Sequence, residues 1–366
     1  MQRIIQGRRA WKLVLLSGLL GLMLALSSCT FPGMVSTNAQ LPAYVPVGEQ
    51  KPLPPVQFPQ DEGSHNNLTE WWYYTGHFNG QDGHRYGFEF VIFQVSRSDL
   101  PPLFASHFAI SDITRGQFAY AQRNVMLPLD NSKQAGINVG IGDWRIQGLN
   151  GHDRLEASMK DYAIKLDLNG VKAPTLHDGK GLITYGLAGY SYYYSRTRMQ
   201  VSGTLLDHGQ PVQVNGQAWM DHQWGNFLTL GSGGWDWYSI QLSNGADIMI
   251  YFIRDATGKV ISTYVGYTDD KGQSIVIPQN AVQNEVLDHW LSPHTGINYP
   301  SGWRVSINDP RLKVDLTLTP QLKDQELVVT KSTGNVYWEG AVDIQGQQNG
   351  QSLSGQGYVE LTGYTK

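Results

Sequence analysis

Residues 70–95 read EWWYYTGHFNGQDGHRYGFEFVIFQV and hold two strand-like segments around a turn. Aromatic and β-branched residues, which favour strands, dominate both segments. The Asn-Gly and Asp-Gly pairs between them are typical of tight hairpins. Because side chains alternate along a strand, Glu70, Trp72 and Tyr74 are expected on one face. Trp71 and Tyr73 are then expected on the other, so this stretch predicts an antiparallel hairpin with two chemically distinct faces.

The same pattern continues along the chain. Further strands are predicted at residues 143–149, 154–161, 162–168 and 199–206, with turn signals such as LNGHD, LSNGAD and TDDKGQ between strands. Helical periodicity is nearly absent, and only residues 279–290 are assigned to a short helix. The fold class is therefore all-β and antiparallel. Barrels or strongly curled sheets are expected, because closure removes exposed strand edges.

Length and charge limit the number of domains and the kinds of partner that the chain can have. The 366 residues are enough for two domains of ordinary size. The net charge of −4 and the lack of a basic cluster after the N-terminus exclude a nucleic-acid partner. Charged residues make up only 16% of the chain, while its 41 glycines and 19 tyrosines suit short aromatic strands joined by tight turns.

Two segments far apart in the chain resemble each other. VNGQAWMD at residues 214–221 matches LSGQGYVE at residues 353–360, position for position in residue type from the shared Gly-Gln pair onward. Either this is chance similarity between strands, or the chain is an internal duplication. The duplication predicts two similar β-barrel domains, at residues 58–228 and 229–366. It also places Asp221 and Glu360 at equivalent points.

The N-terminus carries a predicted export signal. Basic residues precede an apolar run that ends in LSSC, with Cys29 as the only cysteine of the chain. Residues 1–29 are interpreted as a lipoprotein signal peptide, with an ordinary signal peptide as the alternative. Lipidated Cys29 would then anchor the exported protein to a membrane of the cell envelope. Residues 30–57 are expected to form a Pro-rich tether.

The segment WMDHQWGN at residues 219–226 concentrates groups that could do chemistry. In a strand, His222 and Trp224 share one face, and Asp221 lies on the other. His222 is either an acid/base group beside an indole or a structural histidine bonded to the backbone. Glu70 is open to two interpretations as well. Burial among aromatic rings would raise its pKa and make it a proton donor, whereas pairing with an arginine such as Arg85 would keep it ionised.

Other candidates come from aromatic stripes and one isolated histidine. Tyr192 and Tyr194 share a face, as do Trp235 and Trp237, and either stripe could be core or cavity lining. His107 is expected to point inward with Ala109. The motifs G-x-S-x-G, H-E-x-x-H and G-x-G-x-x-G at a strand–helix junction are absent from the sequence, and so is any cysteine pair. No metal and no cofactor are therefore predicted.

Three blocks together resemble a known family. HNNLTEWWYYTGHF, DHQWG and the terminal GYVELTGY are similar to the lipocalin-like CrtC/AttH family, over about residues 58–366. That family includes carotenoid 1,2-hydratase, also named hydroxyneurosporene synthase, and many predicted secreted hydrolases. The resemblance implies two lipocalin-like β domains in tandem. It also implies functional roles for the His-x-Trp pair, here His222 and Trp224.

The resemblance further implies a Tyr-x-Asp pair on a following strand. Tyr251 matches its tyrosine, but Ile253 stands where the acid is expected. The acid would then come from another carboxyl group, with Glu70, Asp221 and Glu360 among the candidates. We expect His222, Trp224, Asp221, Tyr251 and Glu70 to be catalytic. The expected ligand-binding residues share an aromatic or polar side chain near this region: Trp71, Tyr73, His107, Tyr192, Tyr194, Trp237 and Glu360.

The expected function is binding of a hydrophobic, isoprenoid- or polyketide-like molecule in an apolar cavity. The bound molecule would be hydrated or isomerised by acid/base chemistry, as in carotenoid 1,2-hydratase. The alternative is a carrier without catalysis that delivers such a ligand to or from a membrane transporter.

Overall fold

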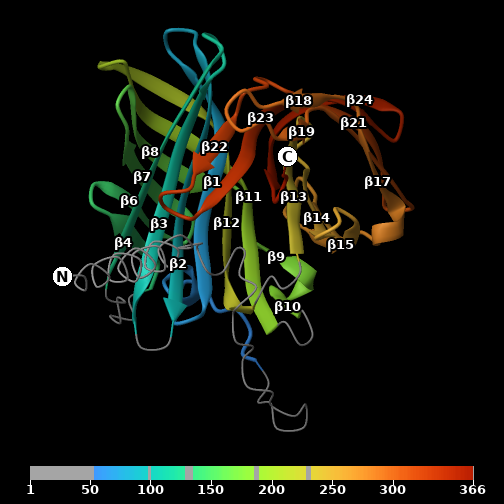
Figure 1. Cartoon of the computed structure of the whole chain (residues 1–366). Coiled ribbons are helices and arrows are strands. Elements are labelled where there is room, and N and C mark those ends of the chain that lie inside the picture. Colours follow the sequence, from blue (N-terminus) through green and yellow to red (C-terminus); the bar gives the residue numbers. More distant parts are fainter. Residues whose placement is uncertain (1–52, 98–99, 128–134, 185–188, 228–231, 366) are drawn as a thin grey trace, which may run out of the picture.

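A computed structural model of the chain describes residues 53–97, 100–127, 135–184, 189–227 and 232–365. The predicted signal peptide with Cys29, most of the tether, and the predicted domain boundary at residue 228 lie outside the described residues. Strands account for nearly all regular structure, and Figure 1 shows them gathered into two curled sheets that lie side by side. The all-β, antiparallel prediction is confirmed.

The first sheet is built from the N-terminal half of the chain. Its strands are β1 (Thr69–Gly80), β2 (Arg85–Arg97), β3 (Leu100–Asp112), β4 (Gln117–Met126), β5 (Ile137–Ile141), β6 (Trp144–Leu149), β7 (His152–Ser158), β8 (Tyr162–Gly170), β9 (Thr175–Leu176), β10 (Leu182–Thr184), β11 (Gly189–Asp207) and β12 (Gln210–Phe227). Its outer strands, β4 and β5, contact each other, so the sheet curls into a nearly closed barrel.

The second sheet is built from the C-terminal half. Its strands are β13 (Ser232–Leu242), β14 (Asp247–Asp255), β15 (Val260–Thr268), β16 (Ser274–Val276), β17 (Val282–Val286), β20 (Trp303–Asp309), β21 (Leu312–Pro320), β22 (Glu326–Val329), β23 (Asn335–Gln348) and β24 (Gln351–Thr362). Strands β18 (His289–Leu291) and β19 (Asn298–Pro300) form a separate pair. The helix predicted at residues 279–290 is wrong. Only a 3₁₀ turn, Gln279–Ala281, precedes β17 and β18, because Val282 and its neighbours pair with β20.

Both sheets follow one strand order. In the first sheet, the first strand, β1, pairs with the last strand, β12. Strands β2, β3 and β4 follow on the side of β1, and β11 and β8 follow on the side of β12. In the second sheet β13 pairs with β24, again the last strand, flanked by β14, β15 and β16 on one side and by β23 and β21 on the other. This common order is what an internal duplication predicts.

Each curled sheet, called a barrel from here on, encloses its own apolar core, and a third apolar cluster lies between the two sheets. Trp72 and Phe90 belong to the first core, Trp338 belongs to the second, and Tyr73 belongs to the cluster between them. The two sheets approach closely at Gly87 in β2. A Cβ atom there would lie 2.5 Å from the Tyr358 hydroxyl of β24, so a larger residue would push the sheets apart. Figure 1 shows β22 and β23 lying across the strands of the first sheet.

The segment before β1 is packed onto the first barrel. Val56 and Phe58 contact the first core, and the Tyr192 hydroxyl donates a hydrogen bond to Pro54 O. Glu62, in the 3₁₀ turn η1 (Gln60–Glu62), forms a buried ion pair with Arg196. Residues from Pro54 onward therefore belong structurally to the N-terminal barrel. Among the described residues, none of the helices has the length and apolar character needed to cross a membrane.

Candidate functional site

Strands β1 and β12 carry functional side chains on both faces. Their register places Trp72 opposite His222 and Tyr73 opposite Asp221. His222, Trp72 and Trp224 point into the first barrel, whereas Tyr73 and Asp221 face the second sheet. Pleating therefore divides the predicted site residues into an inner cluster, inside the first barrel, and an interdomain cluster, between the sheets.

In the inner cluster, Glu70 joins two histidines. Its Oε1 atom lies 2.8 Å from His222 Nε2 and 2.7 Å from His65 Nδ1. Its Oε2 atom accepts a hydrogen bond of 2.8 Å from the backbone N–H of His65. Arg85, the partner considered from the sequence, instead pairs with Asp343. Glu70 and His222 are both fully buried, whereas His65 is partly exposed, so the network runs from the barrel interior toward the surface.

Protonation in the inner cluster follows from these contacts. Burial alone would raise the pKa of Glu70, but hydrogen bonds from His222 and His65 lower it below its usual range. Burial would lower the pKa of His65, yet its bonds to Asp61 and Glu70 raise it to about 9. Burial dominates at His222 and lowers its pKa. Glu70 is therefore ionised at neutral pH and does not fit the proton-donor interpretation.

Aromatic rings enclose the inner cluster. Trp224 stacks on His65 with ring centroids 4.2 Å apart, and Trp72 stacks on His222 at 4.8 Å. Tyr192 stacks on Trp224, and the Tyr194 hydroxyl lies 3.3 Å from His222 Nδ1. These rings pack against one another and form part of the first core. The interior expected to be an apolar cavity is thus filled here by side chains.

The interdomain cluster is built around buried carboxyl groups. Asp221 accepts hydrogen bonds from the Tyr193 hydroxyl, the Ser195 hydroxyl and Trp219 Nε1. Burial nevertheless raises the pKa of Asp221 to about 6. The Tyr193 hydroxyl also accepts a bond of 3.2 Å from Trp237 Nε1, which links Asp221 to the second sheet.

Glu360 differs from the other acids of this cluster in being partly exposed. Its Oε2 atom accepts a hydrogen bond of 2.7 Å from Trp235 Nε1. Burial of the carboxyl group raises its pKa to about 7, the charge of Asp221 adds to the rise, and the Trp235 bond opposes it. A large fraction of Glu360 is thus protonated near neutral pH, at a position that solvent reaches.

Two more glutamates lie deeper between the sheets. Glu89 accepts a hydrogen bond of 2.9 Å from the Tyr337 hydroxyl, and Glu339 accepts one of 2.8 Å from Tyr73. The second carboxyl oxygen of each glutamate is buried without a hydrogen-bond partner. Burial raises the pKa of Glu89 to about 8 and that of Glu339 well above its usual value. Both carboxyl groups are therefore held protonated at neutral pH.

His107 belongs to this deeper region. Its Nδ1 atom lies 2.7 Å from the Tyr337 hydroxyl and its Nε2 atom 3.0 Å from Ser332 Oγ. It shares a face with Ala109, as expected, but that face looks toward the second sheet and not into the first barrel. Burial lowers the pKa of His107 to about 3, so its ring is neutral.

The partly exposed rim of the interdomain cluster is aromatic. Trp71, Trp235 and Tyr251 are partly buried residues packed against the cluster that contains Trp237. Trp237 stands opposite Tyr251 on one side and opposite Glu360 on the other. The structure thus gathers most of the predicted interdomain residues around Glu360, while His222, Trp224, Glu70, Tyr192 and Tyr194 gather inside the barrel.

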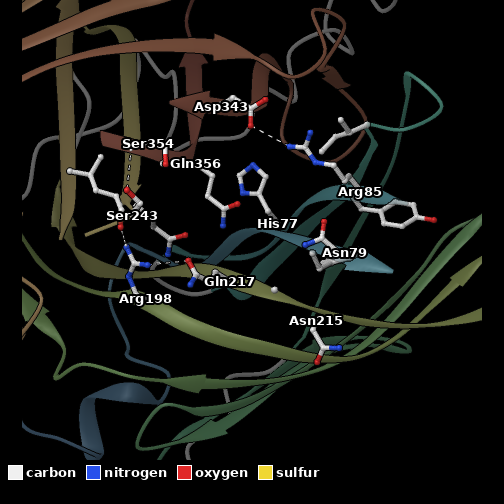
Figure 2. A pocket seen from close by; sticks show the side chains of 17 residues that line it. His77, Asn79, Arg85, Arg198, Asn215, Gln217, Ser243, Asp343, Ser354 and Gln356 are labelled. Carbon is white, nitrogen blue, oxygen red and sulfur yellow. Dashed lines mark hydrogen bonds and ion pairs between the residues drawn. The ribbon is translucent and has the colours of Figure 1, made fainter. Parts of the chain in front are cut away.

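A polar cavity of about 600 Å³ also lies between the two sheets. His77 points into it, with Arg85 and Asp343 on one side and Arg198 bonded to Gln217 on another (Figure 2). The Nε2 atom of His77 is buried without a partner, and burial lowers the pKa of this ring to about 4. Polar and charged side chains dominate the lining, so this cavity is not the apolar one expected from the sequence.

Among the residues that the structure describes, two groups of side chains have the donor atoms to hold a metal ion. In the inner cluster, ligand atoms of His65, Glu70 and His222 lie within 4.8 Å of one another. A second group, of Asp82, His84 and Asp207, lies nearer the surface. The first group joins residues far apart in sequence, which is why no metal motif appears in the chain.

The sequence did not predict roles for Glu89 and Glu339 or the pairing of His65 with Glu70. Glu89 could have been noticed in the sequence, because it is the charged residue within the otherwise apolar run GFEFVIF. Its neighbours on the same face of the strand, Gly87 and Val91, are not polar, which predicts a buried face. Nothing comparable marked Glu339, whose surroundings depend on contact with the other half of the chain.

Comparisons with known proteins agree with this architecture. The AttH-like family profile matches residues 49–364. The crystal structure of a candidate AttH protein from Nitrosomonas europaea is 31% identical, with a TM-score of 0.77, covering 86% of this chain and 99% of that one. No curated protein matches the sequence significantly.

More distant structures share the fold alone. Kievitone hydratase from Nectria haematococca is 16% identical with a TM-score of 0.69, covering 86% of this chain and 94% of its own. CghA in complex with Sch210972 is 12% identical with a TM-score of 0.52, covering 81% of this chain and 89% of its own. The resemblance seen in the sequence is thereby confirmed: the chain belongs to the AttH-like family and has its tandem lipocalin-like fold.

Proposed function

We propose that this protein is a hydratase-type enzyme that acts on a carbon–carbon double bond of a hydrophobic molecule bound at the aromatic rim between the two barrels. Glu360 is the proton donor. One observation carries the proposal: Glu360, a partly exposed residue whose carboxyl group has a pKa of about 7, stands among Trp235, Trp237 and their aromatic neighbours.

The chemistry requires an acid that is still protonated near neutral pH. Glu360 transfers its proton to one alkene carbon, which leaves a cation on the other. The faces of aromatic rings stabilise a cation by about 0.5–2 kcal/mol each. Water then adds to the cation and returns a proton to the Glu360 carboxylate, so the acid is regenerated. Trp235 Nε1 holds the carboxyl group in place throughout.

The inner cluster has a different role in this proposal. His222 is fully buried beneath Trp72 and Trp224, so substrate does not reach it in this conformation. It fixes the register and orientation of β12, and thereby the position of Asp221 on the opposite face. The charge of Asp221 in turn helps to raise the pKa of Glu360. The hydratase activity named for one distant structural neighbour supports the type of reaction, since that protein shares the fold.

Solvent isotopes test the proposal directly. Purified protein is incubated with a panel of prenylated and isoprenoid alkenes in D₂O, and products are analysed by mass spectrometry and NMR. A hydratase adds deuterium to carbon and hydroxyl to its neighbour. Recovery of bound but unaltered ligands, with no deuterium on carbon, would instead favour the carrier that works with a membrane transporter.

We further propose that the protein is exported and anchored to the cell envelope through lipidated Cys29. The apolar run followed by LSSC supports this placement. Detergent partitioning of the wild type and of Cys29→Ser tests it. The wild type is expected in the detergent phase and the variant in the aqueous phase. Equal partitioning of both would contradict lipidation.

A further inference from the structure

We propose that His65, Glu70 and His222 bind a divalent transition-metal ion, such as Zn²⁺. The three side chains come from the loop after η1, from β1 and from β12, and their donor atoms lie within 4.8 Å of one another. Two imidazole nitrogens and a carboxylate oxygen are the donor set of many three-ligand zinc sites, in which water completes the coordination. In the present structure, hydrogen bonds of 2.7 and 2.8 Å connect these atoms, so they are already assembled.

The atoms that would not touch the metal are also held in place. His65 Nε2 lies 3.4 Å from Asp61 Oδ1, and His222 Nδ1 lies 3.3 Å from the Tyr194 hydroxyl. Metal-binding histidines usually bond through the second ring nitrogen to a carboxylate or another polar group, which fixes the tautomer. The second Glu70 oxygen accepts the His65 backbone N–H. Each ligand thus has the supporting contact that a metal site requires.

The charges at the site favour a cation. Among the described residues, the ion-pair partners of Glu70 are the two histidines, while the nearby Arg196 is paired with Glu62. When metal binds, His65 releases the proton that its Nδ1 atom now directs at Glu70, whereas the single proton of neutral His222 moves from Nε2 to Nδ1, beside the Tyr194 hydroxyl. One carboxylate and two neutral rings then face the ion, and no lysine or arginine competes for the carboxylate.

Metal binding at this site would fasten the N-terminal segment to the barrel. His65 lies in the segment that packs across Tyr192 and Tyr194 through Pro54 and Phe58. Glu70 and His222 belong to the barrel wall. A bound ion would therefore join that segment to the barrel, and its removal is expected to loosen residues before β1.

Metal titration of the full-length protein without an affinity tag tests the site. Protein freed of metal by chelation is titrated with Co²⁺, followed by its visible absorption, and then with Zn²⁺ by calorimetry. We expect saturable binding of a single ion. His65→Ala, on a partly exposed loop, and Glu70→Gln are each expected to weaken binding by at least about 100-fold, since a direct ligand matters more than its supporting groups.

His84→Ala is the matched control, because His84 belongs to the other group of potential ligands. It is expected to bind metal as the wild type does. In parallel, limited proteolysis is expected to cut the segment before β1 faster without metal than with it. The proposal is overturned if the wild type binds no Co²⁺, if His65→Ala and Glu70→Gln bind as tightly as the wild type, or if His84→Ala alone abolishes binding.

Discussion

Glu360 in β24 occupies the position in the second sheet that Asp221 in β12 occupies in the first. Each acid stands on the last strand of its sheet, opposite an aromatic residue of the first strand: Tyr73 for Asp221 and Trp237 for Glu360. Both face the space between the barrels, and burial raises the pKa of both. They differ in exposure, since Asp221 is buried under three hydrogen-bond donors and Glu360 is partly exposed. That asymmetry is why we assign catalysis to Glu360.

Replacing Glu360 with glutamine should remove the proposed proton donor while keeping its shape and its hydrogen bond from Trp235. We expect turnover to fall by about 10²–10⁴-fold, the contribution typical of a general acid. Ligand affinity should change little. Steady-state kinetics and calorimetry with any substrate found in the D₂O experiment measure both. The exposed Glu285→Gln is the control, and near-normal turnover in Glu360→Gln would contradict the assignment.

Trp235→Phe should alter the pH dependence of the reaction. The bond from Trp235 Nε1 lowers the pKa of Glu360, so its removal raises that pKa from its value of about 7. Because the protonated acid is the active form, activity is lost as pH rises through this pKa. The alkaline limit of the pH–rate profile is therefore expected to move to higher pH. A shift to lower pH would show that another group controls this limit.

Glu89→Gln should change how stability depends on pH. Glu89 has a pKa of about 8 in the folded protein against an ordinary value of 4.5. Between about pH 4.5 and 8, the folded protein keeps the Glu89 proton, whereas the unfolded chain has released it. The free energy of unfolding therefore falls as pH rises from about 4.5 toward 8. We expect the variant to lose less thermal stability than the wild type between pH 5 and 8. Thermal unfolding measures this, with Glu285→Gln again as the control.

Tyr73→Phe should weaken the contact between the barrels. Its hydroxyl donates to Glu339 across the interface, and both groups are buried. Loss of the donor leaves a buried carboxyl oxygen unpaired, at a cost of about 1–3 kcal/mol in the free energy of unfolding. A double-mutant cycle with Glu339→Ala, which removes the acceptor oxygens, isolates the coupling when the free energy of unfolding is measured with denaturant. Additive effects of the two substitutions would mean that this hydrogen bond contributes nothing to stability.

Alternation along strands was enough to predict which side chains share a face. The separation of Glu70 and Trp72 from Trp71 and Tyr73, and of His222 from Asp221, follows from pleating alone. The resemblance of residues 214–221 to 353–360 pointed to the repeated strand order now seen in β1–β12 and β13–β24. Both features could be predicted because each follows from the order of residues within short segments of the chain.

Features that depend on contacts between distant segments were not predictable in this way. The pairing of Glu70 with His222 requires β1 to lie beside β12. In the sequence these two strands are separated by most of the first barrel. Lowering of the Glu70 pKa follows from that pairing, so the sequence left open whether this acid is protonated. Residues 279–290 were misassigned because their extended conformation is imposed by pairing of β17 with β20.

Titration of the Glu360 carboxyl group tests the central claim most directly, because it needs no substrate. Carboxyl resonances of ¹³C-labelled protein are followed with pH, and Glu360 is identified by its absence from the spectrum of Glu360→Gln. We predict a midpoint of about 7. A midpoint near the ordinary value of 4.5 would mean that Glu360 is ionised at neutral pH, and it would contradict its role as the proton donor.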